Sequence, residues 1–183
     1  MRLNIIACIN QKRALGKNGD LLYKISNDLR NFKKITNGGI VIMGKNTWNS
    51  LPIKPLPGRA NIILSKTGLS YEEDEPINLD KFLRTNFITL NSLDAALSFA
   101  EALTAFFTKE DEAFIIGGAS LYQKALEKNY VDNLYITEVL DDTEGDVYFP
   151  DFEKDKGWKI WFETDPIIDP KSNLKYRYKF YRK

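Results

Sequence analysis

The sequence contains no histidine and a single cysteine. The lack of histidine excludes Ser-His and Cys-His nucleophilic pairs and histidine-bound metal sites. One cysteine cannot form a disulfide within the chain, which is typical of a reducing compartment. Cys8 lies in an apolar run, so we interpret it as a buried thiol. We therefore expect neither a metal site nor an activated nucleophile.

Excess charge and long apolar runs are also lacking. The formal net charge is +1, so no global field attracts nucleic acid or an anionic membrane surface. The apolar run near the N-terminus, L-N-I-I-A-C-I, is too short for a signal peptide or a membrane span. We expect a soluble, cytoplasmic protein without a membrane or nucleic-acid partner. The final stretch, K-Y-R-Y-K-F-Y, interleaves cations and aromatics as single-strand nucleic-acid binders do, but a strand with one buried face has the same alternation.

The chain of 183 residues predicts one domain, residues 1–183, without internal repeats. Apolar runs predict strands that alternate with amphipathic helices, which indicates an α/β fold with a mostly parallel sheet and helices on both faces. The expected strands are 3–9, 40–43, 61–64, 87–90, 113–116 and 133–140, and an antiparallel hairpin of 158–164 and 175–183 closes the sheet. We expect helices over 26–36, directly after Gly44, over 79–83, from Asn91 or Ser92 to 103, and over 120–128. We interpret residues 10–20 as a polar loop that can cover a site, 67–84 as a solvated insertion, and 141–150 as an acidic loop.

Asp28 is the most distinctive acidic residue. Ser26 is a candidate N-cap, which places Asp28 in the first helical turn. Phe32 and Ile35 follow at i+4 and i+7, so the carboxylate shares an apolar stripe where burial would raise its pKa. The alternative is an ordinary acid at a helix N-terminus, favoured by the macrodipole. Thr137, in the middle of a predicted strand, is a buried hydroxyl that needs a partner.

Two glycine turns follow predicted strands and lead into helices. They are Gly44-Lys45-Asn46-Thr47 and Gly117-Gly118-Ala119-Ser120, and Ser65-Lys66 follows a third strand. Free backbone N–H groups at such turns bind phosphate, although a tight packing turn looks the same in sequence. Together they suggest a dinucleotide across the sheet, and Lys45 and Lys66 favour NADPH over NADH. The G-x-G-x-x-G fingerprint is absent, so an ordinary Rossmann site is not expected.

With these features in place, the sequence resembles the dihydrofolate reductase family over nearly its whole length. The resemblance is carried by I-I-A-C-I, L-G-K-N-G, D-L-R-N-F-K, V-I-M-G-K-N-T-W, P-L-P-G-R-A-N-I-I-L-S, I-I-G-G-A-S-L-Y, Y-I-T and E-G-D-V-Y-F-P, in that order. It implies that fold and NADPH-dependent reduction of 7,8-dihydrofolate to 5,6,7,8-tetrahydrofolate, a reaction of one-carbon metabolism and thymidylate synthesis. It also implies a monomer that antifolate inhibitors bind.

The resemblance assigns site residues by position. Asp28 would hold the pterin with Thr137, and Arg59 would hold the glutamate α-carboxylate of the substrate. Leu21 and Tyr23, at the end of a mobile loop of residues 15–22, would join Asp28 as catalytic residues. The remaining substrate-binding residues would be Ile6, Ala7, Phe32, Leu51, Leu56 and Ile116. The cofactor-binding residues would be Ala7, Leu15, Gly16, Gly19, Gly44, Lys45, Asn46, Thr47, Leu64, Ser65, Lys66, Ile116, Gly117, Gly118, Ala119, Ser120, Leu121 and Tyr122. Family members have a cis peptide at the paired glycines.

Two positions depart from the family pattern. Leu22-Tyr23 stands where Pro-Trp is usual, and Lys45 stands where the cofactor turn usually has Arg. Two other hypotheses remain open from the sequence. One is a pyrimidine reductase of riboflavin synthesis, which shares the architecture, and the P-L-P-G-R stretch and the context of Asp28 argue against it. The other is a non-catalytic nucleotide or nucleic-acid binder.

Overall fold

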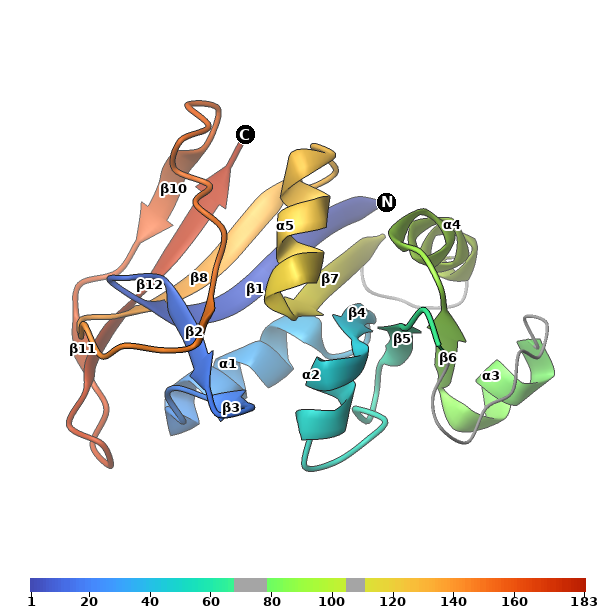
Figure 1. The fold of residues 1–183 in the computed structure, drawn as a ribbon, viewed down its shortest axis with the longest axis horizontal. Coiled ribbons are helices and arrows are strands. Elements are labelled where there is room, and N and C mark those ends of the chain that lie inside the picture. Colours follow the sequence, from blue (N-terminus) through green and yellow to red (C-terminus); the bar gives the residue numbers. More distant parts are fainter. Residues whose placement is uncertain (68–78, 105–110) are drawn as a thin grey trace.

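The computed structural model describes residues 1–67, 79–104 and 111–183. Within them, nine strands form the central sheet (Figure 1). In spatial order the first eight are β10 (Lys159–Glu163), β12 (Lys175–Arg182), β8 (Asn133–Val139), β1 (Arg2–Asn10), β7 (Glu112–Gly117), β4 (Ile40–Gly44), β5 (Ala60–Leu64) and β6 (Phe87–Leu90). The ninth, β11 (Ile167–Ile168), pairs with β12.

The central sheet is mostly parallel. β1 is parallel to β7 and β8, β4 is parallel to β5 and β7, and β5 is parallel to β6. Only β12, with its partners β8, β10 and β11, makes antiparallel pairs in this sheet. The predicted fold class and closing hairpin are confirmed. As a consequence, the carboxyl ends of six parallel strands lie along one edge of the sheet.

Helices cover both faces of the sheet, because alternate strand residues point to opposite sides. Leu3, Ile5 and Ile9 of β1 share a core with α4 and α5, whereas Ile6 packs into the cluster that includes Trp48 of α2. The helices are α1 (Ser26–Thr36), α2 (Lys45–Ser50), α3 (Leu79–Thr85), α4 (Leu93–Leu103) and α5 (Ala119–Glu127). Among the described residues, none of the helices is long and apolar enough to cross a membrane.

The two predicted caps have different outcomes. Ser92 caps α4, and its Oγ accepts a hydrogen bond from the Ala95 backbone N–H at 3.2 Å. The prediction for Ser26 is wrong, because Ile25 is the N-cap of α1 and no side chain caps that end. Ile25 is 1% exposed and clusters with Val139 of β8, so packing of an apolar residue sets where α1 begins.

The prediction that residues 10–20 form an irregular loop is only partly right. β2 (Ala14–Lys17) and β3 (Asp20–Leu21) pair there, and β2 also pairs with β9 (Val147–Tyr148) from the predicted acidic loop. The Asp146 N–H donates to the Gly16 carbonyl at 3.0 Å. A small second sheet therefore joins two segments that are distant in sequence. The predicted insertion falls largely on residues 68–78, outside the described residues, and α3 occupies the predicted short helix.

The alternating last strand is explained by packing and ion pairs. Tyr176 and Tyr181 of β12 are buried. Arg177 and Lys179 point to Glu138 of β8, with nitrogen–oxygen distances of 2.6 and 2.9 Å. Because these two cations are paired with Glu138 within the sheet, the alternation of cations and aromatics is explained without a nucleic-acid partner.

Candidate functional site

The carboxyl edge of the parallel strands gathers most of the predicted site residues. Ligands of α/β proteins bind at this edge, because the loops after each strand meet there. Five of the strands end in or next to polar or small residues there: Asn10, Gly44, Ser65, Asn91 and Gly117.

At this edge Asp28 and Thr137 meet across α1 and β8. The Thr137 hydroxyl donates to Asp28 Oδ1 at 2.5 Å. Thr137 is 5% exposed and lies beside Cys8 of β1 in the strand register. The expectation that Thr137 needs a partner is confirmed, and the partner is the carboxylate in the first turn of α1.

Burial controls the electrostatics of this pair. Burial raises the pKa of Asp28 above its ordinary carboxyl value, and the Thr137 hydrogen bond opposes part of that rise. Burial also raises the pKa of the Cys8 thiol, and the nearby Asp28 charge adds to it. Cys8 is therefore protonated at neutral pH, which agrees with the interpretation of a structural thiol.

Asp28 is expected to reduce stability at neutral pH. Its pKa in the folded state exceeds its ordinary value of 3.8, so its contribution to stability is greatest below that pH and is lost as the pH rises through the folded-state pKa. Asn cannot ionise, so Asp28→Asn is expected to unfold at a higher temperature than the wild type at neutral pH. The gain should disappear in acid, where the wild-type carboxyl is protonated in both states. Melting curves across this pH range test the sign, and a less stable variant at neutral pH would contradict it.

The apolar residues predicted to contact the substrate fall into two clusters. Four predicted residues join one cluster around Trp48 and Phe114: Ile6, Leu51, Leu56 and Ile116. Ala7 differs, since its side chain belongs to the core on the opposite face. A hollow of about 380 Å³ is lined by Ile6 and Thr137, together with Asn31 and Ile35 of α1 and residues of β8, β10 and β12. This hollow was not predicted.

Arg59, the predicted binder of the glutamate α-carboxylate, is a buried residue rather than an exposed one. Only 4% of its surface is exposed to solvent. Nη1 donates to Thr36 Oγ1 at 3.0 Å, and Nε donates to the Pro57 carbonyl at 3.1 Å. The guanidinium carbon lies 5.7 Å from the centre of the Phe32 ring. Burial lowers the pKa of Arg59. Thr36, in the last turn of α1, orients the guanidinium beside Phe32, which is also a predicted substrate-binding residue.

The glycine turns meet at the other side of the edge. Gly117 has φ of +139°, and a Cβ there would lie 2.8 Å from Thr47 Oγ1 of α2. Met43 of β4 is in register with Gly117, and the Gly117–Gly118 peptide is cis, as the resemblance implied. Gly118 is the N-cap of α5, so Ala119 and Ser120 begin that helix. Because the two turns lie this close together, the backbone N–H groups at the starts of α2 and α5 could bind the same phosphate group.

Beside these turns lies a hollow of about 130 Å³. Six of the predicted cofactor residues line it: Gly44, Leu64, Ser65, Lys66, Ser120 and Leu121. Sequence reasoning missed four further residues: Asn91, Ser92, Leu93 and Lys124. The signal for the first three was available, since they directly follow another parallel strand, β6. Lys124 could not be predicted in this way, because its place at the hollow depends on how α5 is oriented in the folded protein.

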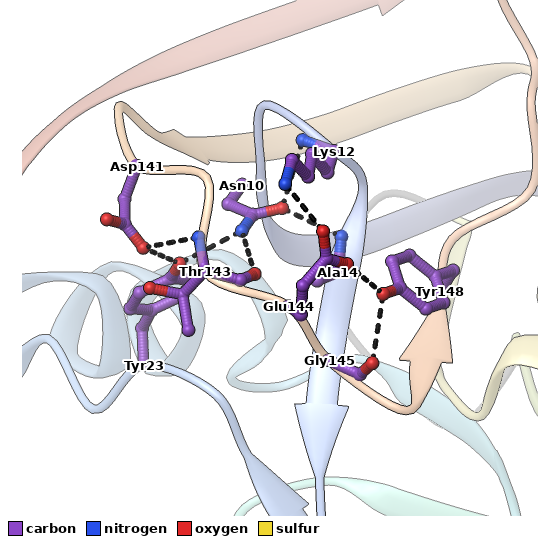
Figure 2. A network of polar contacts seen from close by, with 9 residues as sticks. All are labelled: Asn10, Lys12, Ala14, Tyr23, Asp141, Thr143, Glu144, Gly145 and Tyr148. Carbon is purple, nitrogen blue, oxygen red and sulfur yellow. Dashed lines mark hydrogen bonds and ion pairs between the residues drawn. The ribbon is translucent and has the colours of Figure 1, made fainter.

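The other predicted residues lie as follows. Lys45, Asn46 and Thr47 form the first turn of α2, and Leu15 and Gly16 lie in β2. Gly19 precedes β3, where Leu21 is 53% exposed. Tyr122 is buried and donates to the Ile6 carbonyl at 2.9 Å. The Tyr23 hydroxyl binds Asp141 and Asn10 (Figure 2).

Comparisons with known proteins agree over nearly the whole chain. A family model described as dihydrofolate reductase matches residues 2–183. Dihydrofolate reductase of Sus scrofa is 32% identical over 194 residues, covering 99% of this chain and 97% of that protein. Dihydrofolate reductase of Bacillus subtilis (strain 168) is 31% identical over 181 residues, covering 99% and 94%. The solved structure of Enterococcus faecalis dihydrofolate reductase, complexed with NADP(H) and RAB-propyl, has a TM-score of 0.76 at 24% identity and covers 99% of this chain and 95% of that one.

Proposed function

The chain belongs to the dihydrofolate reductase family and reduces 7,8-dihydrofolate with NADPH, and from this premise we propose that Asp28 and Thr137 mark its pterin site. The observation that carries the proposal is the half-buried Asp28 carboxylate, whose pKa is raised and which is bonded to Thr137 at the carboxyl edge of the sheet. A carboxylate accepts two parallel hydrogen bonds, which suits the neighbouring N3 and 2-amino groups of a pterin. Asp28 would anchor the ring and favour its protonated form, and water would deliver the proton to N5.

The second half of the proposal concerns the cofactor. The turns at Gly44 and Gly117 fit a dinucleotide pyrophosphate, because the missing Cβ at Gly117 lets the turn approach Thr47 closely and brings the N-termini of α2 and α5 together. Ser65 and Lys66 border the hollow next to them and would bind the adenosine end. NADPH supplies the hydride when bound. The protein's own residues bind and orient it, and Ile6 and Ile116 exclude water from the reacting faces.

For the substrate tail, we propose that Arg59 binds the glutamate α-carboxylate. Its bonds to Thr36 and Pro57 orient the guanidinium, and Phe32 supports one face. Arg59→Gln is expected to raise the KM for dihydrofolate about 10-fold or more with a smaller change in kcat, since a charge-assisted hydrogen bond made equally in ground and transition states is lost. Steady-state kinetics test this, and Arg30→Gln, on the exposed surface of α1, is the matched control. An unchanged KM in folded Arg59→Gln would contradict the role.

The direct test of function is loss of NADPH absorbance when the purified protein meets dihydrofolate, repeated with NADH and with pyrimidine intermediates of riboflavin synthesis. NADPH oxidation with dihydrofolate and not with the pyrimidines supports the proposal. NADPH oxidation only with a pyrimidine overturns it.

We propose further that the protein acts as a single-domain cytoplasmic monomer. The single, partly buried Cys8 supports a reducing compartment such as the cytoplasm.

A further inference from the structure

Asn10 is the last residue of β1, at the edge of the sheet where the site lies. It is only 1% exposed. Its Nδ2 donates to the Tyr23 hydroxyl at 3.0 Å and to the Thr143 carbonyl at 2.8 Å. Its Oδ1 accepts from the backbone N–H groups of Lys12 at 3.1 Å and Ala14 at 2.9 Å. The amide therefore uses both donors and two acceptor positions within the protein, which gives it one orientation.

Tyr23 extends this network to Asp141 (Figure 2). Its hydroxyl donates to Asp141 Oδ2, which also accepts from the Thr143 N–H at 3.1 Å. Burial and the Asp141 bond raise the pKa of Tyr23 to about 12, so the hydroxyl stays a donor. Hydrogen bonds from Thr143 and Tyr23 lower the pKa of Asp141, so the carboxylate stays an acceptor at neutral pH.

The network ties down both ends of one segment, residues 11–22. This segment leaves β1 at Asn10, forms β2 and β3, and returns at Tyr23. Two residues later, Ile25 begins α1, the helix that carries Asp28. The loop after β8 is thus bonded to the start of segment 11–22 through Asn10 and to its end through Tyr23.

Backbone bonds also join the two segments: β2 pairs with β9, and the Gln11 N–H donates to the Asp141 carbonyl at 3.2 Å. The other side-chain bonds between them lie at the surface. Lys12 pairs with Glu144, and the Tyr148 hydroxyl donates to Glu144 at 2.7 Å (Figure 2). Exposed bonds of this kind contribute little, because water and salt screen them. Loss of a bond at a buried amide leaves a polar group unpaired, which costs more.

We propose that Asn10, Tyr23 and Asp141 are positioning residues that hold segment 11–22 over the nicotinamide side of the cleft. This rests on the proposed function, which places Leu15, Gly16 and Gly19 beside the cofactor. The three side chains act through the backbone of segment 11–22 and through the start of α1. This gives Tyr23 a positioning role in place of the catalytic role expected from the sequence, because its hydroxyl is bonded to Asn10 and Asp141.

The test compares Tyr23→Phe and Asp141→Ala with Tyr148→Phe, a matched change on the exposed side of the same network. In the first two variants, amide hydrogen exchange of segment 11–22 in the ligand-free protein should speed up about 3- to 10-fold, as expected for one lost hydrogen bond. The KM for NADPH should rise and single-turnover hydride transfer should slow by a similar factor of about 3 to 10, while the dissociation constant of dihydrofolate changes less than about twofold. Asp141→Asn still accepts from Tyr23 and should restore most of each value.

The outcomes separate the two proposals. If the wild type does not oxidise NADPH with dihydrofolate, the proposed function fails, and faster exchange confined to segment 11–22 still supports the tether. If the wild type turns over and Tyr23→Phe matches Tyr148→Phe in exchange, KM and hydride transfer, the inference is wrong. A uniform loss of protection throughout the chain, with equal loss of affinity for both ligands, also overturns it.

Discussion

Asp28→Asn is expected to lower kcat/KM for dihydrofolate by about 10²- to 10⁴-fold at neutral pH, the range of a lost proton-linked group. The amide keeps the shape of the side chain and can still accept from Thr137 Oγ1, so the geometry of the pair survives. It removes the negative charge that favours protonated pterin. The loss of activity should shrink as the pH falls, because more of the pterin is then protonated without help from the carboxylate.

The measurement is initial rate against pH for the wild type and the variant, with the dissociation constant of NADPH measured alongside. Asp94→Asn is the matched control, since Asp94 is an exposed carboxylate paired with Lys128. Its rate should stay within about twofold of the wild type. Full neutral-pH activity in Asp28→Asn would remove Asp28 from the reaction, whereas loss of NADPH binding as well would indicate general damage.

Gly117→Ala is expected to lower the free energy of unfolding by about 2–4 kcal/mol and to abolish tight NADPH binding. Two causes combine. The φ of +139° disfavours any Cβ, and the new Cβ would lie 2.8 Å from Thr47 Oγ1 and 3.2 Å from Thr47 Cγ2. Any shift that relieves this contact moves the turn before α5 away from α2, where the phosphates are proposed to bind. Urea unfolding and NADPH fluorescence titration measure both effects.

Gly38→Ala separates the two causes. Gly38 also has a positive φ, +78°, but a Cβ there meets nothing within 4 Å, so its cost should be about 1 kcal/mol. Removing the obstructing side chain with Thr47→Ala should restore about 0.5–3 kcal/mol to Gly117→Ala. Equal costs at the two glycines, without restoration, would show that the contact with Thr47 is unimportant.

Much of the fold and site was predictable from local pattern. Continuous apolar runs such as Ile40–Met43 require burial on both faces, and a glycine turn directly after such a run must lie at a sheet edge. Ser26 as a cap predicted Asp28 in the first turn of a helix, and Asp28 lies there although Ile25 is the actual N-cap. The need of the Thr137 hydroxyl for a partner followed from its place in an apolar strand. These features depend on residues close in sequence, so the sequence by itself determined them.

Only the tertiary structure decided the features that depend on distant partners. Packing of Ile25 against β8 starts α1, and α1 in turn buries Arg59 through Thr36. β2 exists as a strand because β9 pairs with it, and Asn10 becomes a buried junction because Tyr23 and Thr143 converge on it. Local composition does not show such convergence, since hydrogen bonds and burial between remote segments are satisfied only after the chain has folded.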